Sequence, residues 1–288
     1  MNNNHYMKWI LIIILGLIWG SSFILIKKGL EGFAYVEAAS IRMMAAGVVS
    51  IIPAFFHLKR IPKDKYLVVF LTALFGMFFP AYLFCLAQVK VQSVVAGLLN
   101  ALTPAFAFLI AILFYNTKFK NLHLAGLIIG LCSAILLSLE RSSGNISFNS
   151  YSLFVVLATL SYGTNINVVK NHLQQVNSLS VSFVSVSIAG FLSFLIFFIP
   201  NMSAYAVSSS NIGAFLYLII LGVLGTALAQ VLFNKLIQIS STIFAGSVTF
   251  LIPLVALIWG IIDGEVIGFS HFICILGILF SVYLIRKS

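Results

Sequence analysis

Few polar side chains that could bind a solute occur within the long apolar stretches of this chain. Arg42 is the clearest of them, because it lies a third to halfway along the apolar stretch 34–57. A charged residue inside a membrane span is costly and marks a substrate or ion pathway. Glu37 is five residues away and lies on another helix face, because helical neighbours are three or four residues apart. Two interpretations stay open: Arg42 binds a substrate carboxylate or phosphate, or it binds backbone carbonyls and Ser or Asn groups of a neighbouring helix.

Neutral polar and aromatic side chains supply the other candidates. Asn100 and Thr249 each stand four residues before a proline, and Trp19 and Tyr162 each stand beside a glycine. Such residues could line a polar path, or they could only make hydrogen bonds between helices, which contribute about 0.6 kcal/mol on average. The candidate substrate-binding residues are Trp19, Ser22, Arg42, Tyr82, Asn100, Thr103, Tyr162, Asn165, Gln230, Asn234 and Thr249.

The acidic residues lie at or near the ends of the apolar stretches. They are Glu31, Glu37, Asp64, Glu140, Asp263 and Glu265. A carboxylate proton relay near mid-membrane therefore has no candidate, so facilitated or potential-driven movement and proton or ion coupling both stay open. A membrane enzyme acting on lipids would need a cluster such as Asp263, Glu265 and His271, but that spacing matches no metal motif. We expect no catalytic residues, no metal and no cofactor.

Composition shows which elements must position these residues. Of the 288 residues, 61% are hydrophobic and 8% are charged, whereas soluble domains carry roughly 25% charged residues. Apolar runs of about 17–25 residues cross a bilayer as helices. Ten such runs are present, near 9–27, 34–57, 66–86, 91–114, 122–139, 151–169, 179–199, 211–233, 242–262 and 267–285.

The two halves of the chain repeat each other. A shift of 149 residues places Gly76 on Gly225, Ala96-Gly97 on Ala245-Gly246 and Pro104 on Pro253, and a shift of 143 places Gly20 on Gly163, Lys27 on Lys170 and Gly47 on Gly190. A half with five spans, an odd number, must be followed by a copy that is upside down. The sequence thus predicts an all-α membrane protein with ten transmembrane helices in two inverted five-helix repeats, residues 1–141 and 142–288.

Helix-breaking residues stand at equivalent depths in the two halves. Pro104 and Pro253 lie centrally in the fourth and ninth spans, where each removes a backbone hydrogen bond. Gly20 and Gly163 are the equivalent glycines of spans one and six. We expect these four residues to be hinges, and the two kinked helices to line a central cavity, because freed carbonyls in lipid need protein or water as a partner.

The net charge of +10 is a topology signal. With both termini on one side, that side would carry eleven lysines and arginines and the other side Lys27, Lys28, Lys90 and Arg141. The positive-inside rule places the richer side in the cytoplasm. We therefore expect a multi-pass protein of a bacterial inner (plasma) membrane with both termini cytoplasmic, in contact with the lipid bilayer and not with nucleic acid.

The chain resembles the EamA-like family of the drug/metabolite transporter superfamily. The resemblance rests on Trp19-Gly20-Ser21-Ser22-Phe23, on Ala96-Gly97 through Pro104, and on Ala245-Gly246 through Pro253 with Gly264-Glu265. It departs from the family pattern at Tyr115-Asn116, where a second Gly-Glu pair is common.

The resemblance and the repeat together favour a secondary transporter that moves a small molecule by alternating access about a midplane site. The leading hypothesis is an exporter of amino acids or similar amphipathic solutes, acting as a monomer or homodimer. The alternatives are an importer of a nucleotide-like metabolite and, in a different class, an integral-membrane lipid-processing enzyme.

Overall fold

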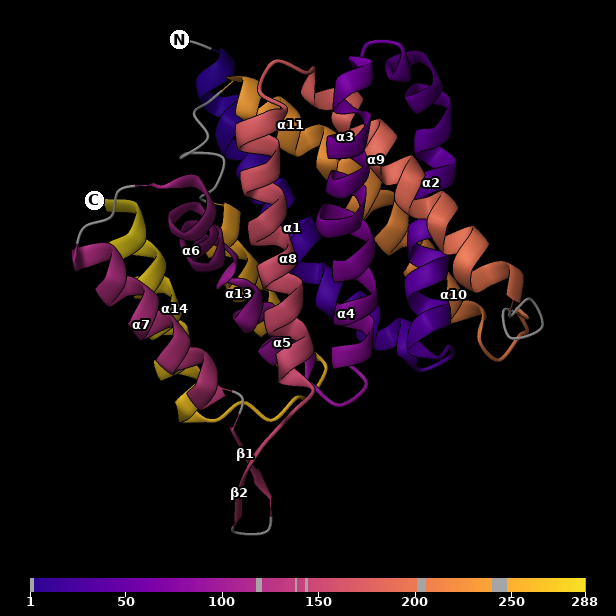
Figure 1. The fold of residues 1–288 in the computed structure, drawn as a ribbon. Coiled ribbons are helices and arrows are strands. Elements are labelled where there is room, and N and C mark those ends of the chain that lie inside the picture. Colours follow the sequence, from indigo (N-terminus) through magenta and orange to yellow (C-terminus); the bar gives the residue numbers. More distant parts are fainter. Residues whose placement is uncertain are drawn as a thin grey trace.

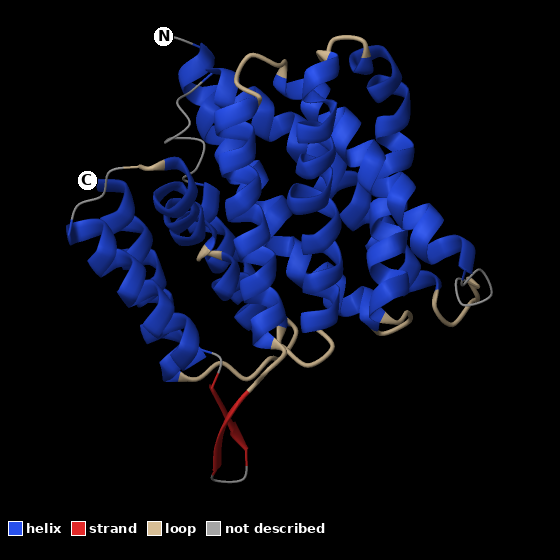
Figure 2. Cartoon of the chain, in the orientation of Figure 1, coloured by secondary structure: helices blue, strands red, loops and turns tan. Residues whose placement is uncertain are grey.

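The computed structural model describes residues 3–117, 121–137, 139–142, 145–200, 206–239 and 248–287. These residues form a helical bundle from which a short β-hairpin projects (Figures 1 and 2). The helices are α1 (Asn3–Leu30), α2 (Tyr35–Leu58), α3 (Tyr66–Ala73), α4 (Phe79–Ala87), α5 (Ser93–Asn100), α6 (Thr103–Tyr115), α7 (Asn121–Leu137), α8 (Ser152–His172), α9 (Ser178–Ser193), α10 (Ile212–Ile220), α11 (Ala229–Ile239), α13 (Val248–Ile262) and α14 (Phe269–Lys287), with a short 3₁₀ turn, η1 (Lys63–Lys65), before α3.

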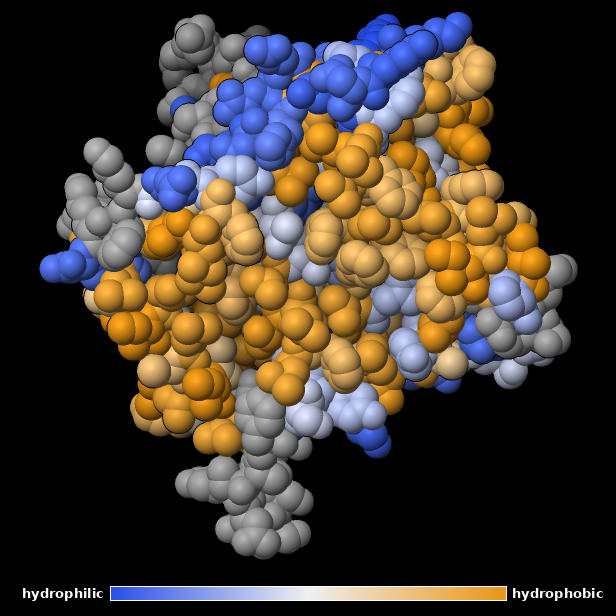
Figure 3. All heavy atoms as spheres, in the orientation of Figure 1, coloured by the Kyte–Doolittle hydropathy of each residue, from blue (hydrophilic) through white to orange (hydrophobic). Residues whose placement is uncertain are grey.

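Length and hydropathy make this a membrane protein, as predicted. Within the described residues, seven helical segments are long and apolar enough to cross a bilayer, and shorter apolar helices cover Asn121–Leu137, Leu251–Ile262 and His271–Ser281. These three lie within the fifth, ninth and tenth of the expected spans. Large hydrophobic side chains such as Ile52, Phe114 and Ile262 are exposed, and Figure 3 shows hydrophobic surface across the middle of the molecule. This surface faces lipid.

In the described chain, π-helical turns interrupt two long helices and follow the end of a third. They are η2 (Leu74–Phe78) between α3 and α4, η3 (Phe194–Phe198) after α9, and η5 (Leu221–Leu228) between α10 and α11. The 149-residue shift superposes η2 on part of η5, and each contains the glycine of its half, Gly76 or Gly225. Single π turns inside α-helices occur frequently at functional sites.

The fourth span is broken rather than kinked. Its helix α5 ends at Asn100, a turn follows at Ala101 and Leu102, and α6 starts at Thr103 with Pro104 in its first turn. Proline fits the first turn of a helix because its missing N–H would have no partner there. Pro253, in contrast, lies inside α13, which is continuous from Val248. The expectation of two similar kinks is therefore wrong for the Pro104 helix.

A β-hairpin joins the two halves of the chain, where we expected only a polar turn. Strands β1 (Leu139–Ser142) and β2 (Asn145–Phe148) pair antiparallel, with Leu139 opposite Phe148. The hairpin defines one face of the bundle, here called the hairpin face, on which the loops 31–34, 88–92 and 263–268 also lie (Figure 1). The opposite face carries the N-terminus, the C-terminus and the loop 59–62, and is called the termini face.

Small residues let the helices of the two halves approach closely. An added Cβ on Gly47 of α2 would lie 3.0 Å from the Cα of Gly190 on α9, and the reverse distance is 2.8 Å. Helices α7 and α14 also pack together, with Gly130 against Ser281 and Gly277 against Ser133. Small residues allow this kind of contact between membrane helices.

Two further contacts correspond under the shifts of 143 and 149 residues. A Cβ on Gly20 of α1 would meet Val255 of α13, and a Cβ on Gly163 of α8 would meet Phe106 and Ala107 of α6. Gly20 corresponds to Gly163, and Val255 corresponds to Phe106. Residues 240–247, which include Ala245-Gly246, lie outside the described residues.

Candidate functional site

Arg42 lies on the buried face of α2, with 7% of the residue exposed. Its Nε is 3.4 Å from the Thr226 hydroxyl of η5, at the long end of the range for a hydrogen bond. The guanidinium also lies near the Tyr162 hydroxyl of α8 and near Cys85 of α4. Arg42 therefore comes from the first half of the chain, and two of its partners come from the second.

The guanidinium has no carboxylate partner among the described residues. The ion pairs found there join Lys27, Lys28 and Lys65 to acids near the ends of helices. An arginine buried in the membrane normally pairs with an acid or with backbone carbonyls. The hydroxyls of Thr226 and Tyr162 carry no negative charge, so the Arg42 charge has no acid partner among the described residues.

Trp19 and Ser22 of α1 lie against η5. The Trp19 Nε1 donates to the Gly225 carbonyl at 3.1 Å, and its ring packs on Phe233 with centroids 5.2 Å apart. The Ser22 hydroxyl donates to the Ile18 carbonyl at 3.1 Å, and a Cβ on Gly225 would lie 3.2 Å from it. This π turn is thus in contact with α1 as well as with Arg42.

Asn165 of α8 has the corresponding place against η2. Its side-chain nitrogen would lie 2.5 Å from a Cβ on Gly76. Tyr162 is one helical turn away from Asn165 on α8 and shares its face. The Gln230 amide of α11 reaches the Met77 sulfur of η2 at 3.8 Å. The candidate residues Asn165 of α8 and Gln230 of α11, both from the second half of the chain, therefore contact η2 of the first half.

Aromatic side chains surround this polar group. The Tyr82 hydroxyl bonds to the Ser40 hydroxyl at 2.8 Å, and its ring lies 4.5 Å from that of Phe197. On another side, Phe84 contacts both Phe23 and Tyr162, with centroids 5.6 and 6.1 Å apart. Such rings suit a flat or amphipathic solute.

Asn100, Thr103 and Thr249 belong to the broken fourth span and to α13. Thr103 donates a local bond to the Asn100 carbonyl at 2.8 Å. Within the described part of the chain, the side-chain oxygens of Asn100 and Asn165 are buried without a hydrogen-bond partner. Buried polar atoms are rarely left in this state, so these two oxygens are unsatisfied acceptors inside the bundle.

The surroundings of Pro253 differ from the expected polar lining. It borders an apolar crevice between α5, α13 and α14, lined by Leu98, Ile275, Ile278 and Leu279, that is too narrow for a water molecule. Thr249 is half-buried on the same helix. The side chain of Asn234 lies outside the described residues.

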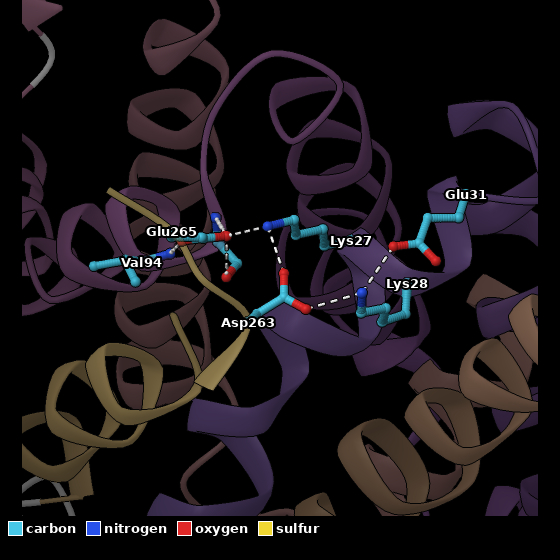
Figure 4. Close-up of polar contacts among 7 residues, drawn as sticks. Lys27, Lys28, Glu31, Val94, Asp263 and Glu265 are labelled. Atoms are coloured by element: carbon cyan, nitrogen blue, oxygen red, sulfur yellow. Dashed lines mark hydrogen bonds and ion pairs between the residues drawn. The ribbon is translucent and has the colours of Figure 1, made fainter. Parts of the chain in front are cut away.

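A second polar group, at the hairpin face, was not predicted as a structural unit. The Lys27 Nζ lies 2.6 Å from Asp263 and 2.7 Å from Glu265, and the Lys28 Nζ lies 2.8 Å from Asp263 and 2.9 Å from Glu31 (Figure 4). The Glu265 carboxylate is 2% exposed. The signal that could have revealed it is the pair of lysines ending α1 together with the acids that follow α13.

Glu265 also caps α5. Its carboxylate accepts from the backbone N–H groups of Ser93 and Val94, each at 3.0 Å, and from the Ser93 hydroxyl at 2.8 Å. A carboxylate is favourable at a helix N-terminus, where N–H groups lack partners. Burial opposes ionisation of Glu265, but the bonds from Lys27, Val94 and Ser93 outweigh it and lower its pKa.

Helices long and apolar enough to cross a membrane, with a polar group at the contact between the two halves, agree with a membrane transporter. A family model of the EamA-like transporter family matches residues 7–139 and again residues 149–287. The chain therefore belongs to the EamA-like transporter family, as the sequence motifs predicted.

Individual relatives agree with this class. The chain is 25% identical over 283 residues to the uncharacterized inner membrane transporter YedA of Escherichia coli (strain K12), covering 93% of this chain and 87% of that protein. It is 25% identical over 213 residues to the uncharacterized transporter YdfC of Bacillus subtilis (strain 168), covering 73% and 68%. A solved structure titled "Crystal structure of protein" has a TM-score of 0.63 over 96% of this chain and 95% of that chain, at 16% identity, which supports the fold.

Proposed function

We propose that the protein is a secondary transporter that exports amino acids or similar small amphipathic solutes by alternating access. Ten helices in two inverted repeats would rock about Arg42, with both termini in the cytoplasm. The close contact of Gly47 with its equivalent Gly190 supports a pseudo-two-fold axis between α2 and α9. Inverted repeats of this kind place the substrate site between them near the midplane.

The observation that carries the proposal is the buried charge of Arg42, which lacks an acid partner among the described residues. A substrate carboxylate would supply that partner, and a planar guanidinium binds a carboxylate through two parallel hydrogen bonds. The free oxygens of Asn100 and Asn165 would accept hydrogen bonds from an ammonium group. Phe84 and Tyr82 would contact the apolar part of the solute.

A single arginine favours a carboxylate over a nucleotide-like substrate, whose phosphates carry more negative charge. The importer of nucleotide-like metabolites is therefore the second candidate, to be separated by measurement. The residues suggested for a lipid-processing enzyme have other roles. Asp263 and Glu265 pair with lysines, and the His271 Nδ1 accepts from the Gly268 N–H at 3.1 Å.

The proposal can be tested by ligand stabilisation, because a ligand that binds only the folded protein raises its melting temperature by mass action. Purified protein would be screened with amino acids, nucleosides, nucleotides and cationic drugs. We expect amino acids to stabilise it, their methyl esters to lack the effect, and Arg42→Gln to abolish it. Arg60→Gln, a change in the exposed loop 59–62, serves as the control. Equal stabilisation by an amino acid and its ester, or by nucleotides alone, would contradict the proposal.

A further inference from the structure

The ion-pair cluster at the hairpin face connects the two halves of the chain. Lys27 and Lys28 end the first helix and Ser93 begins α5, all in the first half, whereas Asp263 and Glu265 follow α13 in the second (Figure 4). This cluster of five residues is here called the hairpin-face latch. A motion that separated the halves at this face would have to break charge-assisted bonds of 2.6 to 3.0 Å.

The equivalent position at the termini face can be found from backbone hydrogen bonds. The Glu265 N–H donates to the Gly260 carbonyl, and the N–H groups of both Asn116 and Thr117 donate to the Ala111 carbonyl. Gly260 and Ala111 correspond under the 149-residue shift. Both Asn116, at the sequence offset, and Thr117, one residue later, therefore share the backbone acceptor that corresponds to that of Glu265.

The backbone conformation selects Thr117 from these two residues. Gly264 before Glu265 has a φ of 73°, and Asn116 before Thr117 has a φ of 50°. Both are left-handed, a region that glycine and asparagine enter readily. The α6 end thus contains one extra residue relative to α13, and the matching pair is Asn116-Thr117 rather than Tyr115-Asn116.

The termini face therefore has the lysine of a latch without its acid. Lys170 is the counterpart of Lys27, and within the described residues it forms no ion pair. Asp64 is the acid of this face, and it pairs with its neighbour Lys65 at 3.3 Å. The cross-half hydrogen bonds found here join Tyr115 to His172 at 3.4 Å and His57 to Ser180 at 2.8 Å, and neither involves a carboxylate.

We infer that this asymmetry sets the resting state: the hairpin-face latch holds that face closed, and the substrate-free transporter opens preferentially to the termini face. The inference depends on the proposed alternating access. Two states of one carrier differ in population according to their differential contacts. Among the described residues, the ion pairs that join the two halves lie at the hairpin face. An exporter that takes up its solute in the cytoplasm would use this bias.

Cys85 provides a native reporter of access to the central site. It is fully buried on α4, beside Arg42. Replacing Cys132 and Cys274 by alanine leaves Cys85 as the single thiol. A small, membrane-impermeant, anionic thiosulfonate reagent would then be applied to right-side-out and inside-out vesicles, and the rate of Cys85 modification measured from each face.

We expect Cys85 to react faster from the termini face. Glu265→Gln should raise the rate from the hairpin face by about tenfold, the equilibrium change that loss of one hydrogen bond to a charged group typically brings. Thr117→Glu should supply the missing acid to Lys170 and slow the reaction from the termini face, whereas the uncharged Thr117→Gln should leave it unchanged. Thr117 is exposed, so these two variants do not disturb the core.

With the latch residues unchanged, faster modification of Cys85 from the hairpin face than from the termini face would overturn the inference. So would a Glu265→Gln protein, folded by its melting temperature, in which Cys85 stays unreactive from the hairpin face. Equal rates in Thr117→Glu and Thr117→Gln would also overturn it. Labelling needs no substrate, so a failed ligand screen with the predicted labelling pattern would refute the amino acid proposal and leave the latch standing.

Discussion

Gly47 of α2 and Gly190 of α9 pack backbone to backbone, although 143 positions separate them in the sequence. They are also equivalent to each other under that same shift. A residue that contacts its own counterpart lies on or near an axis that relates the two. This contact supports the proposed pseudo-two-fold arrangement more directly than similarity of composition could.

Gly190→Ala should destabilise the protein at this contact. The added Cβ would lie 2.8 Å from the Gly47 Cα and 2.8 Å from the Met43 carbonyl oxygen, and neither backbone can move cheaply. Overpacking of this kind costs about 1–3 kcal/mol. Thermal unfolding in detergent would measure it. Gly213→Ala is the control, because a Cβ there meets nothing within 4 Å, and an equal melting temperature for both variants would refute the close contact.

Tyr162→Phe should weaken substrate binding with little effect on folding. The change removes a hydroxyl that lies near the Arg42 guanidinium and keeps the ring that packs on Phe84. We expect a severalfold higher KM for transport in proteoliposomes. Tyr217→Phe, at an exposed position on α10, is the matched control and should behave as the unmodified protein. A KM that does not respond to Tyr162→Phe would remove this residue from the site.

Gly76→Ala should displace the Asn165 amide, which would lie 2.5 Å from the new Cβ. Because a side chain can move where a backbone cannot, we expect a small loss of stability and a larger loss of ligand-induced stabilisation. Gly225→Ala is the comparison, since its nearest contacts, at 3.0 and 3.2 Å, are looser. Unchanged ligand stabilisation in Gly76→Ala would show that Asn165 does not contact the solute.

The contribution of the latch to folding stability should depend on pH only in the acid range. Hydrogen bonds from Lys27 and Lys28 lower the pKa of Asp263, and those received by Glu265 outweigh its burial and lower its pKa from 4.5. A carboxyl group whose pKa is lower in the folded state than in the unfolded state contributes stability at pH values above its unfolded pKa. That stability is lost as the pH falls through the folded-state pKa. The melting temperature difference between the unmodified protein and Glu265→Gln should stay constant from about pH 8 to about pH 5 and shrink below that. A difference that shrinks already near neutral pH would contradict these pKa directions.

The sequence predicted the membrane fold well because lipid imposes a simple rule on composition. Runs of apolar residues must become helices there, so the spans around Arg42 and Tyr162 could be located from hydropathy alone. The π turns at Gly76 and Gly225 could not be foreseen, because nothing in an apolar run distinguishes a π turn from an α turn. Only the coincidence of the two glycines indicated that these positions are special.

Some residues of the candidate site could be predicted from the sequence, and others could not. Arg42 was identifiable because a charge in an apolar stretch is conspicuous, but its partners Thr226 and Tyr162 lie in the other half of the chain and depend on packing. The role of Glu265 was missed because an acid near a span end ordinarily suggests a solvated loop. The counterpart of Glu265 was placed one residue too early, at Asn116, because an extra residue at the end of α6 is invisible in the sequence offset.

Counterflow exchange in proteoliposomes tests the central claim most directly, that a carboxylate-bearing solute is carried past Arg42. Vesicles preloaded with unlabelled amino acid should take up the labelled form faster than empty vesicles, and the uptake should saturate. Arg42→Gln should abolish the exchange, whereas Arg60→Gln should leave it intact. Exchange by Arg42→Gln at the rate of the unmodified protein would contradict the account.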